Sequence, residues 1–231
     1  MDQINAGEFA KCYHTAFCRN SASPAHSMEK KMSEKPFSQA CENNKQPILD
    51  VLTRVFSDST RVLEIGSGTG QHAAYFAPRL PHVQWMTSDL AENHPGIRTW
   101  VEEFPSPNLL LPIALDVHEP SWAFVAVDTV FSANTAHIMH WPDVEAMFGG
   151  VAQLLEPGGV FAVYGPFNYA GKFTSDSNAR FDASLRARDP GMGIRDFEAV
   201  DALAVAGGLV LLEDNPMPAN NRTLVWRKGE G

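Results

Sequence analysis

Apolar positions fall into a regular pattern from residue 47 onward. Ile48, Leu49, Leu52 and Phe56 have helical spacing, and Pro47 suits a first helical turn, so a first helix is predicted to begin there. Apolar runs of strand length then alternate with helical stripes. The predicted strands are residues 61–65, 83–89, 109–116, 125–134 and 160–167, and the predicted helices are residues 71–80, 93–104 and 142–155. This alternation predicts βαβ units and a mostly parallel sheet.

The alternation pauses after the fifth predicted strand. Residues 168–196 form a polar insertion, in which we expect one helix with loops. A helix at 197–206 precedes two apolar runs, at 209–213 and 223–227, and the link between these runs is too short for a helical crossover. The last strand is therefore predicted to be antiparallel. The whole pattern predicts an α/β fold, with a seven-stranded, mostly parallel sheet and helices on both faces.

The start of the chain has a different character. Residues 1–35 are largely polar and lack a clear periodicity, so they are expected to form a flexible extension before a single domain at 36–231. This extension contains Cys12, His14, Cys18 and His26. Their spacing matches no common zinc module, so we expect no metal site, with zinc binding as the minor alternative.

Composition and charge narrow the classes of function. Hydrophobic residues make up 44% of the 231 residues and charged residues 19%, which is enough apolar material for a substantial core. The formal net charge of -9 disfavours nucleic acid and anionic membranes as partners, and no apolar run is long enough to span a bilayer. Three cysteines give no disulfide framework, which favours a reducing, cytoplasmic location. We expect a monomer or homodimer.

A glycine-rich loop directly follows the first predicted strand. It contains Gly66, Ser67, Gly68 and Gly70, and such a loop between a strand and a helix is typical of nucleotide-binding folds. Dinucleotide-binding folds prefer a third glycine one position later than Gly70. Glu64 lies just before the loop, where its carboxylate would repel a diphosphate but attract an ammonium and a sulfonium. The loop therefore predicts S-adenosylmethionine rather than NAD as the cofactor.

Two further carboxylates lie at the ends of the next strands. Asp89 ends the second predicted strand, where it can bind ribose hydroxyls, and Asp116 ends the third, where it can accept from an adenine amino group. Either alone is equally well explained as a strand-ending or capping residue. Because the carboxyl ends of parallel strands share one edge, the three acids together predict one site. Leu90, Val117 and Asn134 at the same strand ends complete the predicted cofactor site.

At these residues the sequence resembles the class I S-adenosylmethionine-dependent methyltransferases. Residues 62–70, Val-Leu-Glu-Ile-Gly-Ser-Gly-Thr-Gly, resemble their first motif. Residues 154–159, Leu-Leu-Glu-Pro-Gly-Gly, resemble the turn before their fifth strand. The resemblance implies a Rossmann-like, seven-stranded sheet with a reversed last strand.

A narrower resemblance covers about residues 36 to 228. The sequence is similar to a methyltransferase-like family catalogued as domain of unknown function nine-three-eight. The segments that carry it are residues 38–49, 165–168, 175–178, 181–182, 185–186, 189–190, 193–196 and 218–221. Residues 138–141 depart from the family's usual sequence pattern, so Met139 and His140 are not assigned a role.

The segment after the fourth predicted strand bears on the methyl acceptor. Residues 132–137 read Ser-Ala-Asn-Thr-Ala-His, which differs from the Asn-Pro-Pro-Tyr type of motif in nucleic-acid amino methyltransferases. Together with the acidic charge, this favours a small-molecule acceptor. His137 is the candidate base or substrate anchor, and a capping or core histidine is the alternative of equal weight.

Further candidate substrate residues lie on the fifth strand and beyond it. They are Tyr164, Phe167, Asn168, Asn178, Arg186, Arg195 and Asn220. Tyr164 and Phe167 would wall an apolar slot, or would simply pack in the sheet. Arg186 or Arg195 would clamp a carboxylate, although Arg186 has the spacing of a helical ion pair with Asp182. Asparagine at 220 also suits a turn.

Asn44 precedes the first predicted helix and is a candidate for the cofactor's amino-acid end, with a helix cap as the alternative. The leading hypothesis is a methyltransferase that acts on a small molecule, with transfer to sulfur, oxygen or nitrogen left open. The alternative is a non-catalytic, S-adenosylmethionine-binding interaction or regulatory subunit. A nucleotide-dependent oxidoreductase is a weaker third hypothesis.

Overall fold

The protein was analysed in a computed structural model, which describes residues 35–120, 122 and 126–230. Residues 1–34 of the predicted N-terminal extension lie outside the described residues, and so do the alternative zinc ligands Cys12, His14, Cys18 and His26. Lys35 belongs to the folded unit, because its ammonium pairs with Glu103 at 2.7 Å and lies over the Trp100 ring.

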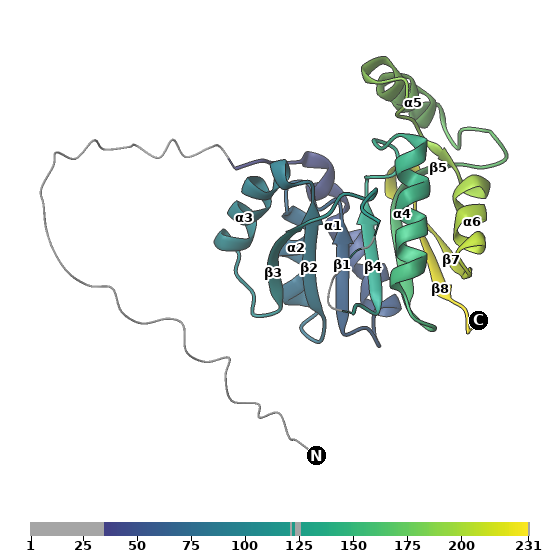
Figure 1. The fold of residues 1–231 in the computed structure, drawn as a ribbon. Coiled ribbons are helices and arrows are strands. Elements are labelled where there is room, and N and C mark those ends of the chain that lie inside the picture. The colour runs from purple at the N-terminus through teal and green to yellow at the C-terminus, as the bar shows by residue number, and fades with distance from the viewer. Residues whose placement is uncertain (1–34, 121, 123–125, 231) are drawn as a thin grey trace, which may run out of the picture. The chain divides into compact units, whose positions relative to one another are not determined.

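A single mixed sheet forms the centre of the fold (Figure 1). Its strands are β1 (Arg61–Ile65), β2 (Gln84–Asp89), β3 (Leu109–Ala114), β4 (Thr129–Ala133), β5 (Val160–Asn168), β6 (Arg195–Asp196), β7 (Leu209–Met217) and β8 (Asn221–Lys228). The order is β3-β2-β1-β4-β5-β8-β7, with the short β6 beside the end of β5. The first five strands are parallel, whereas β8 is antiparallel to both of its neighbours. The predicted α/β fold with a reversed last strand is therefore confirmed.

Helices cover both faces of this sheet. They are α1 (Gln39–Val55), α2 (Gln71–Phe76), α3 (His94–Glu103), α4 (Trp141–Leu154), α5 (Asp176–Arg188) and α6 (Phe197–Ala206). The helices α1, α2 and α3 contribute to the core on one face, and α4 and α6 to the core on the other. Figure 1 shows α5 beyond the carboxyl end of β5. None of the helices in the described ranges has the length and apolar character needed to cross a membrane.

Fully buried aromatic residues dominate both core layers. Phe76, Trp85 and Phe131 pack together on the α1 face, with ring centroids 5.6–5.9 Å apart. Phe161 and Trp226 pack on the other face with centroids 5.8 Å apart. Because the inner strands are covered on both sides, they read as continuous apolar runs, which is why the sequence pattern identified them.

The first helix begins eight residues earlier than predicted. It starts at Gln39, after the Ser38 side chain, which accepts a hydrogen bond from the Cys41 amide at 3.3 Å. Pro47 lies inside the helix rather than in its first turn. The first half of this helix is mostly polar, so it shows no apolar stripe. Asn44 consequently lies within the helix, not before it.

Several other boundaries differ from the pattern-based ones. The strand β3 ends at Ala114, so Asp116 lies in the turn that follows. The fourth strand is predicted at residues 125–134, but β4 begins only at Thr129 and ends at Ala133. The last hairpin is longer on both strands, and the two-residue β6 adds an eighth strand inside the predicted insertion. Apolar periodicity misses these short polar extensions because backbone pairing, not burial, defines them.

The Ser38 cap gives a direct test of the corrected helix start. Replacing Ser38 with alanine is expected to lower the free energy of unfolding by about 1 kcal/mol, because the hydroxyl satisfies an amide in the first turn. Urea denaturation measures this. Ser57→Ala, at an exposed serine past the other end of α1, is the control and should change the free energy by less than about 0.5 kcal/mol. Equal effects of the two substitutions would contradict the assigned cap.

Candidate functional site

A cavity of about 360 Å³ opens at the carboxyl ends of β1, β2 and β3. Strand order reverses between β1 and β4, and ligands of open α/β sheets bind at such switch points. Its volume lies within the usual range for ligand pockets, about 300–1,000 Å³. The lining residues are Ile65, Gly66, Asp89, Leu90, Asn93, Leu115, Asp116, Val117, His118, Thr135, Ile138, Met139 and Asp143.

The glycine loop is shaped by close backbone contacts. Gly66 has φ of +71°, and a Cβ there would lie 2.7 Å from the Thr135 hydroxyl oxygen, so the loops after β1 and β4 can meet only at glycine. Gly70 has φ of +88°, and its Cβ would lie 3.0 Å from the Ile97 Cα. The first contact brings two loops together at the switch point, and the second lets α3 pack against the start of α2.

Asp89 joins the glycine loop to the end of β2. Its Oδ2 accepts a hydrogen bond from the Gly68 amide at 2.7 Å. Its Oδ1 accepts from the Leu90 amide at 2.8 Å and from the Asn93 side chain at 2.7 Å. Ser67 adds a second link, since its amide donates to the Ser88 carbonyl at 3.0 Å. The loop and the strand end therefore form one preorganised wall of the cavity.

Asp116 organises the next strand end. Its Oδ1 accepts from the His118 amide at 3.0 Å, and the His118 ring pairs through Nε2 with Asp143 Oδ1 at 2.7 Å. The hydrogen bond to Asp143 raises the pKa of His118, with a smaller contribution from Asp116. Sequence reasoning missed His118 and Asp143. Asp143 could have been found from the sequence as a capping residue, because it follows His140 by three positions. Its side chain accepts a hydrogen bond from the His140 backbone amide at the N-terminus of α4.

The sequence predicts that the Glu64 carboxylate lies beside the ligand, but the structure buries it. The residue is only 2% exposed and does not line the cavity. Its Oε2 accepts from the Ser67 hydroxyl at 3.0 Å and from the Trp85 indole at 3.1 Å. Burial raises its pKa to about 7 despite these two donors. Glu64 therefore lies beneath the glycine loop, where it can act on a ligand only through its charge.

The predicted cofactor residues thus fall into two groups. The structure brings Gly66, Asp89, Leu90, Asp116 and Val117 together in the cavity wall. The others do not line the cavity: Asn44, Glu64, Ser67, Gly68, Gly70 and Asn134. Asn134 follows β4 with φ of +58°, and its amide donates to the Tyr164 carbonyl at 2.9 Å. In the second group, Ser67, Gly68 and Gly70 shape the glycine loop, whereas Asn44 lies within α1.

Asn44 belongs to a buried polar chain between α1 and α2. Its Oδ1 lies 2.7 Å from His72 Nε2, and both residues are buried. Burial lowers the pKa of His72 to about 4, so the ring is neutral and donates to the amide. Burial also raises the pKa of Tyr164, and the neighbouring Asn44 side chain partly offsets this. These contacts are structural, and they were not predicted from the sequence.

His137 lies in the loop between β4 and α4 and is only 6% exposed. Its ring makes an edge contact with Phe181 of α5, with centroids 5.3 Å apart. Burial lowers the pKa of His137 to about 4, and the charges of Arg195 and Arg188 add to this effect. The ring is therefore neutral at physiological pH. Its neighbour Ile138 lines the cavity, whereas His137 itself does not.

Both candidate arginine clamps are engaged within the protein. Arg186 donates from Nε to Asp182 at 2.7 Å, which is the helical ion pair considered as its alternative. Arg195 is buried and donates to the Ala136 carbonyl at 3.0 Å, the Gly191 carbonyl at 3.0 Å and the Met139 carbonyl. The guanidinium of Arg195 therefore holds the loop that carries His137.

The remaining candidate substrate residues lie near the end of β5. Phe167 is buried against the α4 and α6 face. Asn178 of α5 donates to the Asn220 carbonyl at 3.2 Å, which ties α5 to the tip of the β7–β8 hairpin. Asn168 is 8% exposed and ends β5. The structure thus brings Asn178 and Asn220 together.

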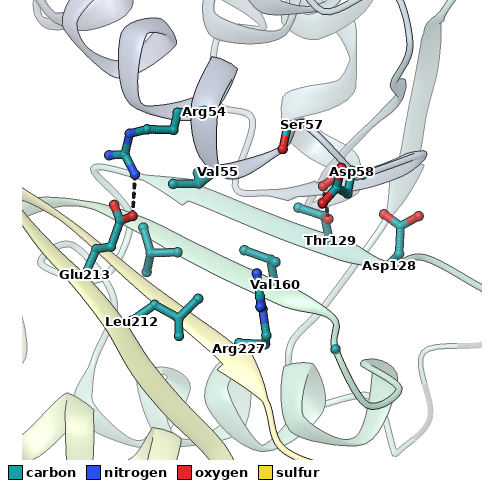
Figure 2. A pocket seen from close by; sticks show the side chains of 13 residues that line it. Arg54, Val55, Ser57, Asp58, Asp128, Thr129, Val160, Leu212, Glu213 and Arg227 are labelled. Carbon is teal, nitrogen blue, oxygen red and sulfur yellow. Dashed lines mark hydrogen bonds and ion pairs between the residues drawn. The ribbon is translucent and has the colours of Figure 1, made fainter.

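A second, larger hollow of about 430 Å³ lies at the opposite edge of the sheet (Figure 2). Figure 2 shows Arg54 of α1 paired with Glu213 of β7 across it. Asp128 accepts from the Thr60 and Arg61 amides at 2.9 Å and 3.2 Å. Because the glycine loop and the acids at the strand ends line the smaller cavity and not this hollow, we favour the smaller cavity as the functional site.

Solved structures of methyltransferases share this fold. An O-methyltransferase family protein from Burkholderia thailandensis superposes with a TM-score of 0.71 at 16% identity, over 83% of this chain and 58% of that chain. Human N-acetylserotonin methyltransferase, solved with S-adenosylmethionine, gives 0.70 at 14% identity over 82% and 53%. An O-methyltransferase family 2 protein from Planctomyces limnophilus, solved with apigenin, gives 0.65 at 14% identity over 80% and 62%. The chain thus spans little more than half the length of these structures.

The sequence of the folded unit also matches one protein family from end to end. The match covers residues 35–228, which includes every strand and helix described above. The segments that carried the resemblance in the sequence lie within this range. The chain therefore belongs to the family described as protein of unknown function (DUF938), and its fold is that of the class I methyltransferases.

Proposed function

We propose that this protein is an S-adenosylmethionine-dependent methyltransferase that acts on a small molecule. The observation that carries the proposal is the wall of the cavity at the switch point. There the glycine loop, Asp89 and Asp116 converge from three successive strand ends. Each of these groups alone is a weak indication of a ligand. Their meeting at one edge of the sheet indicates a site for a nucleoside with an attached cationic chain.

The two acids in the cavity wall, Asp89 and Asp116, retain capacity to bind a nucleoside. A carboxylate offers about four acceptor positions, and Asp89 accepts three hydrogen bonds within the protein. Its Oδ2, which accepts only one of these, can still accept from a ribose hydroxyl. Asp116 uses Oδ1 for the His118 amide, which leaves Oδ2 for an adenine amino group. Leu90 and Val117 supply apolar surface for the base.

A small-molecule acceptor is supported by the surroundings of the site. The net charge of -9 disfavours nucleic acid, and the two candidate arginines are engaged. His137 is neutral and directly precedes Ile138, which lines the cavity, so we propose it as the base or anchor for the acceptor. One structural neighbour was solved in complex with apigenin, which supports a small-molecule acceptor for this chain as well.

A transfer assay tests the proposed activity. Purified protein with methyl-labelled S-adenosylmethionine and a cell extract is expected to label the small-molecule fraction. Label in the protein or nucleic-acid fraction would contradict the acceptor class. Cofactor binding without any labelled product would favour the non-catalytic alternative, and tight NAD binding without S-adenosylmethionine binding would favour the oxidoreductase.

Asp89→Ala is expected to weaken cofactor binding by about 1–3 kcal/mol, because it removes the ribose acceptor and the bond that holds the Gly68 amide. Calorimetry with S-adenosylmethionine measures the change. Asp58→Ala is the matched control, since this exposed aspartate lines the opposite hollow in Figure 2. Unchanged affinity of the Asp89 variant would remove this residue from the cofactor site.

The buried Glu64 predicts a pH-dependent preference between the cofactor and its demethylated product. The pKa of Glu64 is about 7 without ligand, and a sulfonium nearby favours the ionised form. Affinity for S-adenosylmethionine should therefore rise as pH increases through about 7, whereas affinity for the uncharged thioether S-adenosylhomocysteine should rise less.

Glu64→Gln keeps an acceptor for Ser67 and Trp85 but removes the charge. At pH 8 it should weaken S-adenosylmethionine binding by roughly 1 kcal/mol more than S-adenosylhomocysteine binding. Calorimetric titrations at pH 6 and pH 8 measure both ligands. Identical losses for the two ligands would show that Glu64 does not act through its charge.

A further inference from the structure

The His118 side chain lines the cavity at the switch point and is fixed by contacts on two sides. Its backbone amide donates to Asp116 Oδ1 at 3.0 Å, and the Glu119 amide donates to the Asp116 carbonyl at 3.0 Å, which closes a tight turn after β3. Its ring Nε2 pairs with Asp143 Oδ1 at 2.7 Å. The turn after β3 is therefore tied to the first turn of α4 at the wall of the cavity.

The pairing with Asp143 decides which ring nitrogen of His118 carries the proton when the ring is neutral. An ionised carboxylate can only accept, so Nε2 is the donor of this hydrogen bond. Nδ1 of the neutral ring then keeps its lone pair and is an acceptor. Nδ1 is hydrogen-bonded to none of the residues that the structure describes, and the side chain is 54% exposed. His118 thus adds an unused acceptor to the residues that line the cavity.

A nucleoside at the proposed adenine site has a use for this second acceptor. The amino group of adenine carries two N–H donors, and Asp116 Oδ2 can accept from one of them. The other polar groups of the wall lie at other strand ends. Asp89 and Asn93 are bonded to each other at the end of β2 at 2.7 Å, and the hydroxyl after β4 donates to a backbone carbonyl at 3.1 Å. The free acceptor in the same turn as Asp116 is His118.

We propose that His118 selects the base of the cofactor: its Nδ1 accepts one hydrogen of the purine amino group, while Asp116 Oδ2 accepts the other. This inference rests on the proposed function, which places the adenine at Asp116. A 6-oxo purine presents a carbonyl oxygen in place of the amino group, and its lone pairs would face the lone pair of Nδ1. Asp143 is a positioning residue, because it acts on the base through the tautomer of the ring.

Protonation of His118 reverses this selection. The imidazolium donates from both nitrogens, so Nδ1 then favours a carbonyl over an amino group. As described above, the hydrogen bond to Asp143 raises the pKa of His118. The titratable groups around the ring are Asp116 and Glu119 in its own turn, Asp143 and His140 at the start of α4, and Asp89 at the end of β2. The preference for an amino group should therefore be present above the pKa of His118 and should be lost as the pH falls through it.

Two thioethers that differ only at position 6 of the purine test the inference: S-adenosylhomocysteine and its deaminated analogue S-inosylhomocysteine. Both are titrated calorimetrically into the full chain at pH 5.5 and pH 8. Since the two probes carry the same charged groups, an effect of Glu64 on the thioether end cancels in the ratio of their affinities. The preference for the adenosyl compound is expected to be about fivefold larger at pH 8 than at pH 5.5, which is the effect of one hydrogen bond.

Variants of His118 separate selection of the base from a structural role. His118→Phe keeps a ring without nitrogens, so its preference should be smaller at pH 8 and should not change with pH. His118→Asn places an acceptor near the position of Nδ1 that does not titrate, so it should keep the preference at both pH values. Asp143→Asn removes the charge beside the ring, so the midpoint of the pH dependence should move to lower pH. His82→Phe is the matched control, because this exposed histidine precedes β2 at the opposite edge of the sheet, and it should behave as the unmodified protein.

The ratio of the two affinities also gives the outcomes that would overturn the inference. A preference of the unmodified protein that is equal at pH 5.5 and pH 8 would contradict it, and no variant is needed for that result. So would a pH dependence that persists in His118→Phe, or an equal loss of both affinities in this variant with the ratio unchanged. Absence of S-adenosylhomocysteine binding by the unmodified protein would instead contradict the proposed function on which the inference rests.

Discussion

The hydrogen bond from the Gly68 amide to the Asp89 carboxylate joins the ends of the first two strands. In the same loop, Gly66 permits a close approach to Thr135, because a Cβ on Gly66 would lie 2.7 Å from the Thr135 hydroxyl oxygen. The cavity wall, the exposed face of Asp89 and the orientation of the adjoining helix all depend on this junction. A methyltransferase needs such preorganisation, because displacement at a sulfonium depends mainly on alignment.

Charge in the site is arranged in two layers. Asp89 and Asp116 face the cavity, where they can accept hydrogen bonds from a nucleoside. Glu64 lies beneath the loop, away from solvent, and burial rather than a neighbouring charge dominates its pKa. A buried carboxyl that is half-ionised near neutral pH responds strongly to a cation placed above it. The fold therefore offers a physical means of distinguishing a sulfonium from a thioether without a direct contact.

The elements that bury apolar surface could be predicted from the sequence, because periodicity reports burial. The strands β1 and β5 and the helix α4 are clear examples. The first half of α1 could not, since its residues are polar and its stability comes from the Ser38 cap and contacts with α2. Asp89 and Asp116 were identified by their position after buried strands. His118 and Asp143 were missed because their pairing joins segments 25 residues apart. The engagement of Arg186 and Arg195 likewise depends on tertiary contacts that spacing alone leaves open.

The proposed function requires an S-adenosyl nucleoside to occupy the cavity at the β1–β4 switch point. A diffraction map from crystals grown with S-adenosylhomocysteine measures this directly. We expect ligand density across the ends of β1, β2 and β3, with the ribose at Asp89 and the adenine at Asp116. Density in the hollow between Arg54 and Glu213 at the opposite edge, or no density at the switch point at saturating ligand, would contradict it.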